Sequence, residues 1–426
     1  MKKVLIITYY WPPSGGAGVQ RWLKFSKYLP EYGVQPVILT VDPAKASYAQ
    51  VDKSLEHEVS SSVFVYKTNT FEPYNFYKKM VGKEEIPYGG FSNKSEETFL
   101  QKIAKAVRGN FFIPDPRKGW NRFAYRRAVE LVREHRIDTV ITTSPPHSTQ
   151  LIGLKLKREL GIHWVADLRD PWTDIYYYPE LHHSFLSRKL DQAMELKVLR
   201  QADVILTVSE HLKRMFIAKI DPNNDSKVIV IPNGYDEKDF ELKVKASDAK
   251  FVITYTGTIS EKYDINGFLV AISKLDEQKK KGILLRFVGN VSSDIVDKIR
   301  QTIPEVELDL VGYVGHSTSV GFLLRSSLQL LVIPKIKNNK GIVTGKFFEY
   351  LASRKPVLAI GPEGGDLEQL IDETECGKLF NYDDVNGMIS VIDHLITDSF
   401  SLKDVPRSNA YSRKTLTGQL IQKLKL

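Results

Sequence analysis

The sequence predicts an α/β protein built from two doubly wound, parallel-sheet domains that face each other across a cleft. Three observations predict this fold class. Short β-branched apolar runs alternate with helical patterns along almost the whole chain. These runs are apolar on both faces and are bounded by Gly, Pro or Asn, as strands of parallel sheets are. A polar stretch at residues 234–250 interrupts the series and indicates a linker between two such domains.

Seven strands are expected before the polar stretch and five after it. The segments between them suit the helical crossovers of βαβ units, which take about 10–25 residues. The first series comprises residues 3–8, 35–40, 62–67, 138–144, 163–168, 203–209 and 227–234. The second series comprises residues 251–257, 284–290, 306–314, 329–334 and 356–362.

The chain length of 426 residues suits two domains. We expect an N-terminal domain over residues 1–235 and a C-terminal domain over residues 250–405. Residues 406–426 have a helical pattern with no strand after them, and we expect this helix to return to the N-terminal domain. In open α/β sheets ligands bind outside the carboxyl ends of the strands, so the loops that follow the strands should carry the function.

The composition, 42% apolar and 26% charged, is that of a globular protein. The single cysteine, Cys376, excludes an intramolecular disulfide and fits a reducing compartment. Residues 1–13 place two lysines before an apolar run, as signal peptides do, but the run ends in Pro-Pro with no small-residue cleavage site. We therefore expect a first β-strand there, and a cytoplasmic protein.

The net charge is +9, and the excess is concentrated in residues 101–136, which hold ten Lys/Arg against three Asp/Glu. Aromatic residues are interleaved with these cations: Phe111, Phe112, Trp120, Phe123 and Tyr125. This mixture suits an anionic membrane surface or a polyanionic ligand, and the alternative is an amphipathic helix with a solvated basic face. No recognised nucleic-acid-binding module is present, so nucleic acid is not an expected partner.

The first strand is followed by a glycine-rich loop that includes Gly15, Gly16 and Gly18. Glycines allow the backbone to approach a ligand closely, and the helix after them offers free N–H groups to an anion. Arg21 stands where a dinucleotide-binding fingerprint would need its third glycine, which argues against a nicotinamide cofactor. A simple tight turn is the alternative.

Ionisable side chains follow two neighbouring strands of the first domain. Asp167, Arg169 and Asp170 come at the end of one strand, and His147 follows another in a loop that contains two prolines. An aspartate in this position is suited to orient or deprotonate an acceptor hydroxyl, and the arginine would tune the pKa of the aspartate. The alternatives are a structural ion pair of Arg169 with either aspartate and an incidental His147.

Residues 344–366 combine a short helix, a strand and a glycine-rich loop. With Thr344 as N-cap, Lys346 lies in the first helical turn, and Glu349 lies on the same side about 60° away. A helix start with a lysine suits a diphosphate, and a carboxylate one turn later suits both hydroxyls of a ribose. The alternative is a plain i,i+3 ion pair worth about 0.2–0.5 kcal/mol.

Further residues of the second domain lie close to the expected ligand. Gly364 and Gly365 form the loop beside the helix, and Gly289 ends another strand. Lys262 follows the first strand of this domain and is suited to contact a phosphate, although surface lysines are common. Together these residues predict a sugar carried on a nucleoside diphosphate.

The motifs together resemble glycosyltransferases of the GT-B fold, family 4, over nearly the whole chain. The segments that carry the resemblance are residues 12–21, 202–213, 230–236, 311–315, 347–371 and 411–414. The resemblance implies a retaining transferase that uses a nucleotide sugar, with UDP favoured, and needs neither a metal nor another cofactor. It places the nucleotide on the second domain with Glu349 on the ribose, and the diphosphate on Gly15, Gly16, Lys346 and Lys262.

The same resemblance implies a saccharide or lipid-linked saccharide as acceptor, in the assembly of a cell-surface polysaccharide such as capsule or lipopolysaccharide. An anionic membrane would then be met through residues 101–136, on the inner face of the plasma membrane. The donor sugar, the linkage and the oligomeric state do not follow from the sequence.

The chain departs from the family pattern in three places. Gly341 stands where a glutamate usually contacts the donor sugar, and Asn338, Asn339 or backbone amides are the available substitutes. Thr258 replaces a phosphate-binding arginine, and the aspartates of residues 167–170 stand where a histidine is common. Two alternatives therefore stay open, a sugar-nucleotide epimerase of the same fold and a catalytically inactive partner subunit that binds nucleotide sugars.

Overall fold

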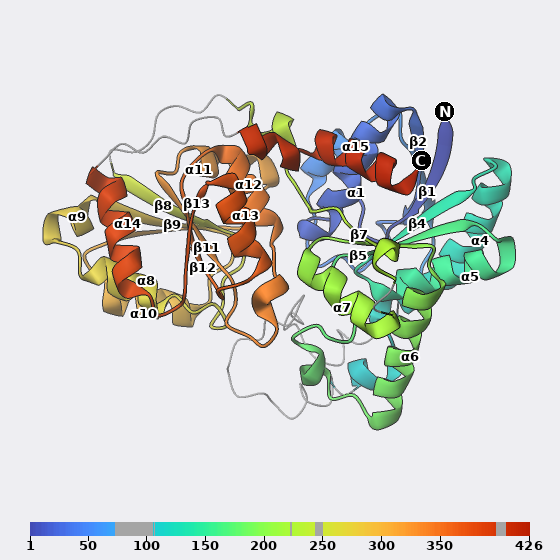
Figure 1. The fold of residues 1–426 in the computed structure, drawn as a ribbon, viewed down its shortest axis with the longest axis horizontal. Coiled ribbons are helices and arrows are strands. Elements are labelled where there is room, and N and C mark those ends of the chain that lie inside the picture. The colour runs from blue at the N-terminus through green and yellow to red at the C-terminus, as the bar shows by residue number, and fades with distance from the viewer. Residues whose placement is uncertain (73–104, 106, 222–223, 243–249, 398–405) are drawn as a thin grey trace. The chain divides into compact units, whose positions relative to one another are not determined.

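The computed structural model describes residues 1–72, 105, 107–221, 224–242, 250–397 and 406–426 (Figure 1). The chain forms two compact units, one made of residues 1–232 and 416–426 and the other of residues 233–415. Each unit has a parallel sheet and its own hydrophobic cores. Part of the expected linker, residues 243–249, lies outside the described residues.

The N-terminal unit contains a seven-stranded sheet in the order β3-β2-β1-β4-β5-β6-β7, with every neighbouring pair parallel. All seven strands expected from the sequence are present. They are β1 (Lys2–Ile7), β2 (Val34–Val41), β3 (Phe64–Thr68), β4 (Thr139–Ser144), β5 (His163–Leu168), β6 (Val204–Thr207) and β7 (Val228–Val230). The strand order reverses between β1 and β4, which is where such folds bind their ligands.

Helices cover both faces of this sheet. They are α1 (Ala17–Tyr28), α4 (Asn121–Glu134), α5 (Gln150–Leu160), α6 (Phe185–Gln201) and α7 (Glu210–Ile220). Alternate side chains of β1 serve the two cores: Leu5 and Ile7 pack in the core that receives α4 to α7, while Val4 and Ile6 pack in the core that receives α1. This alternation explains why the strand reads as a continuous apolar run.

The C-terminal unit contains a six-stranded parallel sheet in the order β10-β9-β8-β11-β12-β13. Its strands are β8 (Phe251–Thr256), β9 (Ile283–Val288), β10 (Glu307–Gly312), β11 (Leu328–Val332), β12 (Val357–Ile360) and β13 (Gly377–Phe380). The sequence predicts the first five. It misses β13, which is an edge strand of four residues whose first two are exposed, so it lacks the apolar signal of the others.

Two cores enclose this second sheet. The helices are α8 (Asn266–Ser273), α9 (Glu277–Gly282), α10 (Ser293–Thr302), α11 (His316–Leu324), α12 (Gly345–Ser353), α13 (Asp366–Thr374) and α14 (Val385–Thr397). One core receives α8, α10 and α14, and the other receives α11, α12 and α13. Cys376 is fully buried in the second of these cores, and its burial raises the pKa of the thiol to about 11.

The end of the chain forms a short 3₁₀ helix, Pro406–Tyr411, and then α15 (Arg413–Leu424). The first residues of α15 belong to the C-terminal unit, whereas Leu416, Leu420 and Leu424 are buried in the N-terminal core beside α1. The expected return of the last helix to the first domain is therefore observed. No helix within the described residues combines the length and hydrophobicity that a membrane span requires.

Candidate active site

Two glycines approach each other closely just past the ends of two neighbouring strands of the C-terminal unit, Gly257 after β8 and Gly289 after β9. This pair is called the glycine turn below. Gly257 and Gly289 have positive φ angles of 94° and 133°, which L side chains rarely adopt. The Gly257 N–H donates to the Val288 carbonyl at 2.7 Å, and a Cβ added at Gly289 would lie 2.4 Å from the Gly257 carbonyl oxygen. The structure thus leaves bare backbone at the carboxyl ends of these strands, where the sequence predicts that Gly289 meets the donor.

Lys346 reaches this glycine turn from the first turn of α12. Its Nζ donates to the Tyr255 hydroxyl at 2.7 Å and lies 4.2 Å from the centre of the Tyr255 ring. A Cβ added at Gly257 would lie 2.6 Å from the Lys346 Cε, so the lysine stem fills the space that the glycine leaves open. Burial lowers the pKa of Lys346 to about 7, and the charge of Glu349 opposes this shift. Among the described residues no carboxylate lies within ion-pair distance of Lys346, so the plain i,i+3 ion pair is not what the structure shows.

Glu349 lies one turn further along α12, and its side chain is 27% exposed. Its Oε1 is 3.8 Å from Nδ1 of His316, the first residue of α11, and Nε2 of the same ring is 3.1 Å from Oδ2 of Asp239. The imidazole therefore stands between two carboxylates, Asp239 and Glu349. Glu349 is the residue that the sequence assigns to the ribose. Sequence reasoning misses His316. Its position directly after Gly315, past the carboxyl end of β10, is the signal that identifies it.

The loop that begins α13 lies against the segment before α12. Gly364 has a φ of 67° and donates its N–H to Glu368 Oε2 at 2.5 Å, while Gly365 occupies the N-cap position of α13. The Lys340 carbonyl lies 2.9 Å from a Cβ added at Gly365, and the exposed Lys340 side chain approaches Gly364. Lys340 is a cation at this loop that the sequence analysis does not single out.

Lys262, the other lysine expected to contact a phosphate, is half-buried in the loop after β8. Its carbonyl accepts the Lys335 N–H at 2.8 Å. The lysine that packs on Gly257 is Lys346.

The segment that lacks the family's glutamate is compact. Gly341 is buried, and the Asn339 amide donates at 3.0 Å to both the Pro334 carbonyl and the Tyr382 hydroxyl. Of the two asparagines expected to replace the glutamate, Asn339 therefore already has partners, and Asn338 is exposed. Thr344 occupies the N-cap position of α12 as expected, but its hydroxyl makes no cap hydrogen bond and is buried without a partner among the described residues.

In the N-terminal unit, the glycine-rich loop after β1 is paired with residues 50–52. Gly15 donates its N–H to the Gln50 carbonyl at 3.0 Å, and Asp52 donates its N–H to the Pro13 carbonyl at 2.8 Å. Gly16 has a φ of 82° and stands in the N-cap position of α1. The Gly15 amide that the sequence assigns to the diphosphate is thus engaged within this unit.

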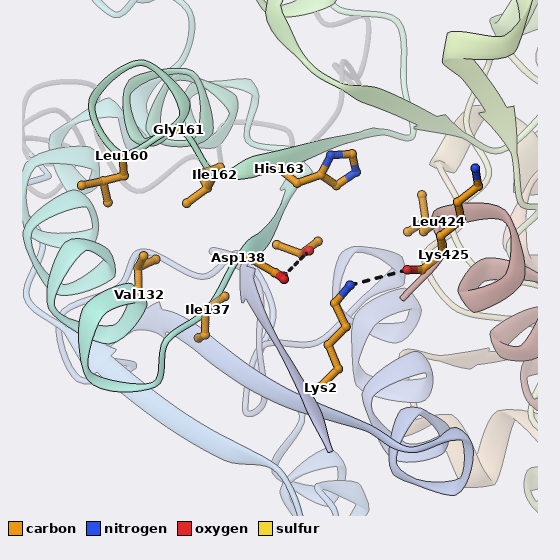
Figure 2. Close-up of a pocket in the computed structure, with 11 residues that line it drawn as sticks. Lys2, Val132, Ile137, Asp138, Leu160, Gly161, Ile162, His163, Leu424 and Lys425 are labelled. Atoms are coloured by element: carbon orange, nitrogen blue, oxygen red, sulfur yellow. Dashed lines mark hydrogen bonds between the residues drawn. The ribbon is translucent and has the colours of Figure 1, made fainter.

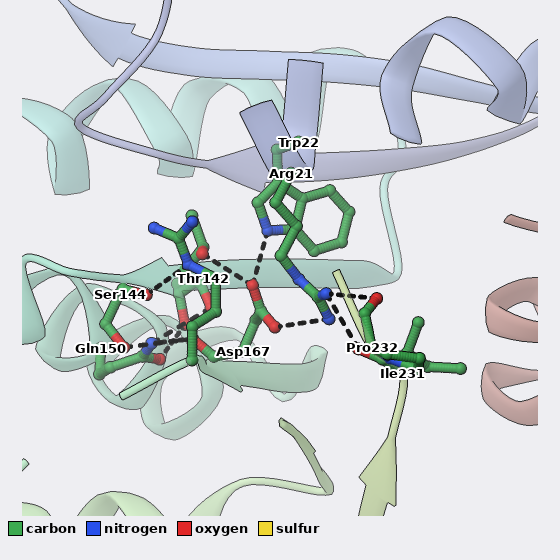
Figure 3. A network of polar contacts seen from close by, with 10 residues as sticks. Arg21, Trp22, Thr142, Ser144, Gln150, Asp167, Ile231 and Pro232 are labelled. Atoms are coloured by element: carbon green, nitrogen blue, oxygen red, sulfur yellow. Dashed lines mark hydrogen bonds and ion pairs between the residues drawn. The ribbon is translucent and has the colours of Figure 1, made fainter. Parts of the chain in front are cut away.

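Asp167 is a structural anchor rather than an exposed loop carboxylate (Figure 3). It is fully buried and accepts hydrogen bonds from Trp22 Nε1 at 2.8 Å and Thr143 Oγ1 at 2.7 Å. Arg21 lies 3.2 Å away and also donates to the carbonyls of Ile231 and Pro232. The expectation that Asp167 orients or deprotonates an acceptor does not fit this environment, because residue 167 still lies within β5 and faces the core.

Asp170, three residues further on, lies past the end of β5. It is half-buried, and no hydrogen bond or ion pair joins it to any described residue. Burial raises the pKa of Asp170, Arg169 opposes the shift and Asp167 adds to it. Arg169 is 9% exposed and donates through Nε to the Ser144 carbonyl at 2.8 Å, which ties the loop after β5 to the end of β4.

His147 lies in the loop after β4 and stacks on Trp172, with ring centres 4.9 Å apart. Burial lowers the pKa of His147 to about 3, and Arg169 and Lys219 add to this effect. The ring is therefore neutral near pH 7 and suited to hydrogen bonding, whereas a general base that becomes charged would be disfavoured.

Two groups near Asp170 and His147 are missed by the sequence analysis. Asp115 accepts hydrogen bonds from the Ser148 N–H at 2.7 Å and the Ser148 hydroxyl at 2.8 Å, which joins its turn to the loop of His147. Burial raises the pKa of Tyr177, and the nearby charge of Asp170 adds to the shift. Asp115 stands between two prolines, Pro114 and Pro116, and that pattern is the available signal.

A shallow pocket of about 580 Å³ lies at the other end of the strands of the N-terminal sheet, away from the loops that follow β4 and β5 (Figure 2). Its lining includes Lys2, Thr139 and His163, the first residues of β1, β4 and β5. It therefore lies at the amino ends of the strands and is separate from the loops described above. In the described part of the chain, no cluster of three or more His, Cys, Asp or Glu side chains is placed to hold a metal ion.

Two family models match successive parts of the chain. The model described as Glycosyltransferase Family 4 matches residues 89–239, and the model described as Glycosyl transferases group 1 matches residues 236–413. A curated relative, the probable glycosyltransferase WbjE of Pseudomonas aeruginosa, is 22% identical over 364 residues, which is 78% of this chain and 88% of WbjE.

Solved structures share the fold along the full length. Anabaena HepE, crystallised with UDP and glucose, superposes with a TM-score of 0.62 at 15% identity and full coverage of both chains. TarM of S. aureus, as a G117R mutant in complex with Fondaparinux, alpha-GlcNAc-glycerol and UDP, superposes with a TM-score of 0.60 at 12% identity, also with full coverage of both. At these identities the likeness shows a shared architecture of two parallel-sheet domains.

Proposed function

The chain is a glycosyltransferase of the GT-B fold, of the family 4 type, and we propose that it transfers a sugar from a nucleoside diphosphate to a saccharide or lipid-linked saccharide. UDP is the favoured nucleotide of this proposal, because UDP is the nucleotide in the HepE and TarM complexes. The proposal extends to a retaining reaction that needs no metal, in the assembly of a cell-surface polysaccharide.

One observation supports the donor assignment above the others. Lys346 is a recessed ammonium whose only hydrogen-bond partner in the described chain is a neutral hydroxyl, that of Tyr255, and it packs on Gly257 at the carboxyl end of β8. A buried cation without an anionic partner is costly, and a diphosphate on the glycine turn would supply that partner. Glu349 lies one helical turn further along α12, and in this proposal its carboxylate accepts hydrogen bonds from the ribose hydroxyls.

The chemistry of leaving-group departure follows from this arrangement. As the glycosidic bond to the donor breaks, negative charge accumulates on the distal phosphate. The Lys346 ammonium and the N–H groups at the start of α12 would stabilise that charge. This is the contribution that a divalent cation makes in metal-dependent sugar transferases.

The acceptor side of the proposal rests on Asp170. Its carboxylate has no partner in the described chain and lies past the carboxyl end of β5, where a hydroxyl can approach it. We assign it to orienting the acceptor hydroxyl and accepting its hydrogen bond. Arg169 and His147 then act as positioning residues, because Arg169 fixes the loop after β5 through the Ser144 carbonyl and the neutral His147 stacks on Trp172 of that loop.

A donor panel tests the proposal. Wild type, Glu349→Ala and the control Glu305→Ala are incubated with UDP-, GDP- and ADP-sugars, and release of the nucleotide is followed. We expect wild type and the control, which removes an exposed carboxylate after α10, to consume a UDP-sugar. Glu349→Ala should raise the donor KM about tenfold or more, because a charged hydrogen bond to the ribose is lost.

Two results would overturn the proposal. Equal KM values for Glu349→Ala and wild type would remove the glutamate from the ribose. Binding of UDP-sugars without any turnover, by wild type and with a range of saccharide acceptors, would instead identify an inactive partner subunit.

A further inference from the structure

Helix α6 has its polarity inverted over its first three turns. Three polar side chains face the protein and are almost completely buried: Ser187, Asp191 and Glu195, at 8%, 1% and 2% exposure. Three large apolar side chains face solvent: Phe185, Leu186 and Leu190, at 72%, 77% and 50% exposure. A surface helix of a globular protein has the opposite arrangement, so this face needs an explanation.

Buried hydrogen bonds fix the orientation of α6. Asp191 accepts from Trp172 Nε1 at 2.7 Å and from the Tyr178 hydroxyl at 2.9 Å. Glu195 accepts from Thr173 Oγ1 at 2.5 Å and from Lys219 Nζ at 2.7 Å. Rotating the helix to hide its leucines would break these hydrogen bonds and leave the buried donors of Trp172 and Tyr178 without their acceptor. The apolar side chains therefore stay on the outside.

A second segment extends the exposed apolar surface. The Asn110 side chain donates to the His182 carbonyl at 3.1 Å and accepts the Ser184 N–H at 2.7 Å, which holds its segment against the start of α6. The next residue, Phe111, is 81% exposed. Phe111, Phe185, Leu186 and Leu190 are called the α6 patch below.

The charges around the α6 patch are positive. Arg188 and Lys189 are both exposed, and Lys189 Nζ lies 5.0 Å from the centre of the Phe185 ring. Residues 181–190 contain no Asp or Glu. Apolar side chains interleaved with cations, without acids among them, match a surface that is apolar inside and anionic outside.

We propose that the α6 patch docks on a lipid bilayer with anionic headgroups, with its apolar side chains in the interfacial layer and Arg188 and Lys189 at lipid phosphates. This proposal places the membrane contact mainly on α6, whereas the sequence predicts it in residues 101–136. Of the five aromatic residues that the sequence interleaves with cations in residues 101–136, Phe111 alone is exposed, since Trp120 is buried and the others are partly buried. Residues 101–104 and 106 of that segment lie outside the described residues.

The proposal deepens the proposed function, since a membrane surface is where a lipid-linked acceptor is found. The vesicle-binding test uses the full chain without any donor. Co-sedimentation is measured with vesicles of phosphatidylcholine alone and of phosphatidylcholine with phosphatidylglycerol, at low and high salt, for wild type, Leu186→Glu and the control Leu242→Glu. Leu242 is 40% exposed and lies in the C-terminal unit.

We expect wild type and Leu242→Glu to bind the anionic vesicles at low salt and to lose binding at high salt, because the Debye length shortens. Leu186→Glu should bind about tenfold or more weakly, because no leucine at this position enters the bilayer and the anionic headgroups repel the glutamate. Nucleotide release from a UDP-sugar should stay equal in all three proteins. That readout separates failure of membrane docking from failure of the proposed function.

Three outcomes would overturn the proposal: no binding of wild type to anionic vesicles, equal binding of wild type and Leu186→Glu, or equal binding to neutral and anionic vesicles. A concentration-dependent dimer of wild type that Leu186→Glu abolishes, together with no vesicle binding, would assign the α6 patch to a second copy of the chain instead.

Discussion

At the scale of single residues, Lys346 should make nucleotide affinity depend on pH. Burial lowers its pKa to about 7 in the nucleotide-free protein, and a neighbouring diphosphate would favour the charged form. Above pH 7 Lys346 is mostly deprotonated in the free protein, so it must take up a proton when UDP binds. Affinity for UDP should therefore fall by up to about tenfold per pH unit as the pH rises from 7.

Calorimetric titration of UDP at pH 8, in buffers of different ionisation enthalpy, measures the proton taken up. Lys346→Arg is the matched control, because a guanidinium stays charged and should show no uptake at this residue. Identical proton uptake in wild type and Lys346→Arg would assign the proton to another group.

Two aspartates three residues apart should respond differently to the same substitution. Asp170→Asn should lower kcat about a hundredfold with little change in donor KM, because the acceptor hydroxyl loses its orienting carboxylate. Asp167→Asn should instead lower the free energy of unfolding by about 3–5 kcal/mol, because it leaves Arg21 buried without its counter-charge.

Steady-state kinetics and thermal unfolding of both variants check this pair. A stable Asp167→Asn protein with a large loss of kcat, together with an active Asp170→Asn, would reverse the two assignments.

Part of the donor site follows from helix geometry. The 100° rotation per residue predicts Lys346 and Glu349 on one side of α12, and in the structure the charge of Glu349 acts on the pKa of Lys346. The partners of these residues do not follow, because Tyr255 and His316 come from β8 and α11, far away in the sequence. The burial of Asp167 could not be predicted either, because its position near the end of a strand does not show whether the side chain faces the core or the loops.

At the scale of secondary-structure elements, the glycine turn after β8 and β9 should tolerate no side chain. Gly289→Ala would place a Cβ 2.4 Å from the Gly257 carbonyl oxygen at a φ of 133°. We expect it to lower the free energy of unfolding by about 1–3 kcal/mol and to weaken UDP binding. Gly282→Ala is the matched control, because a Cβ there meets nothing within 4 Å.

Thermal unfolding with and without UDP measures both effects. If Gly289→Ala and Gly282→Ala have the same stability and the same UDP binding, the backbone around Gly289 accommodates a Cβ and the expectation is wrong.

The strands could be predicted more completely than the loops that join them. Inner strands such as β1 and β12 carry continuous apolar runs because both faces of a parallel sheet are covered. The edge strand β13 has no such run, and β-branched residues are absent from Gly377–Phe380. The Thr344 cap shows a finer limit: the sequence marks the start of α12 correctly, but the hydroxyl makes no cap hydrogen bond.

At the scale of the whole molecule, the last eleven residues should be required by the N-terminal unit. Leu416, Leu420 and Leu424 are 1%, 0% and 5% exposed in its core. Truncation after Thr415 should destabilise this unit by several kcal/mol, at about 1.5–3 kcal/mol for each leucine.

Differential scanning calorimetry of the truncated chain checks this expectation. The transition of the N-terminal unit should fall in temperature while that of residues 233–415 stays unchanged. Triple substitution of the same leucines by alanine in the full chain is the control for length, and an unchanged Tm in both would contradict the packing seen here.

The overall architecture was accessible from the sequence because alternating strands and helices, a polar interruption and a helix without a following strand each have one simple interpretation. The candidate donor and acceptor residues were harder to place, because each set is gathered from loops that only the folded sheets bring together. The motif resemblance supplied the family, and the two family models and WbjE confirm it.

The buried cysteine has a practical consequence. Cys376 is fully enclosed, and its thiol with a pKa of about 11 is almost entirely protonated at neutral pH, so it should resist maleimide reagents in the native state. A pair of cysteines engineered at exposed positions, one in each unit, would then carry fluorescent dyes with no need to remove the native thiol. Energy transfer between such dyes would measure whether the separation of the two units changes during turnover.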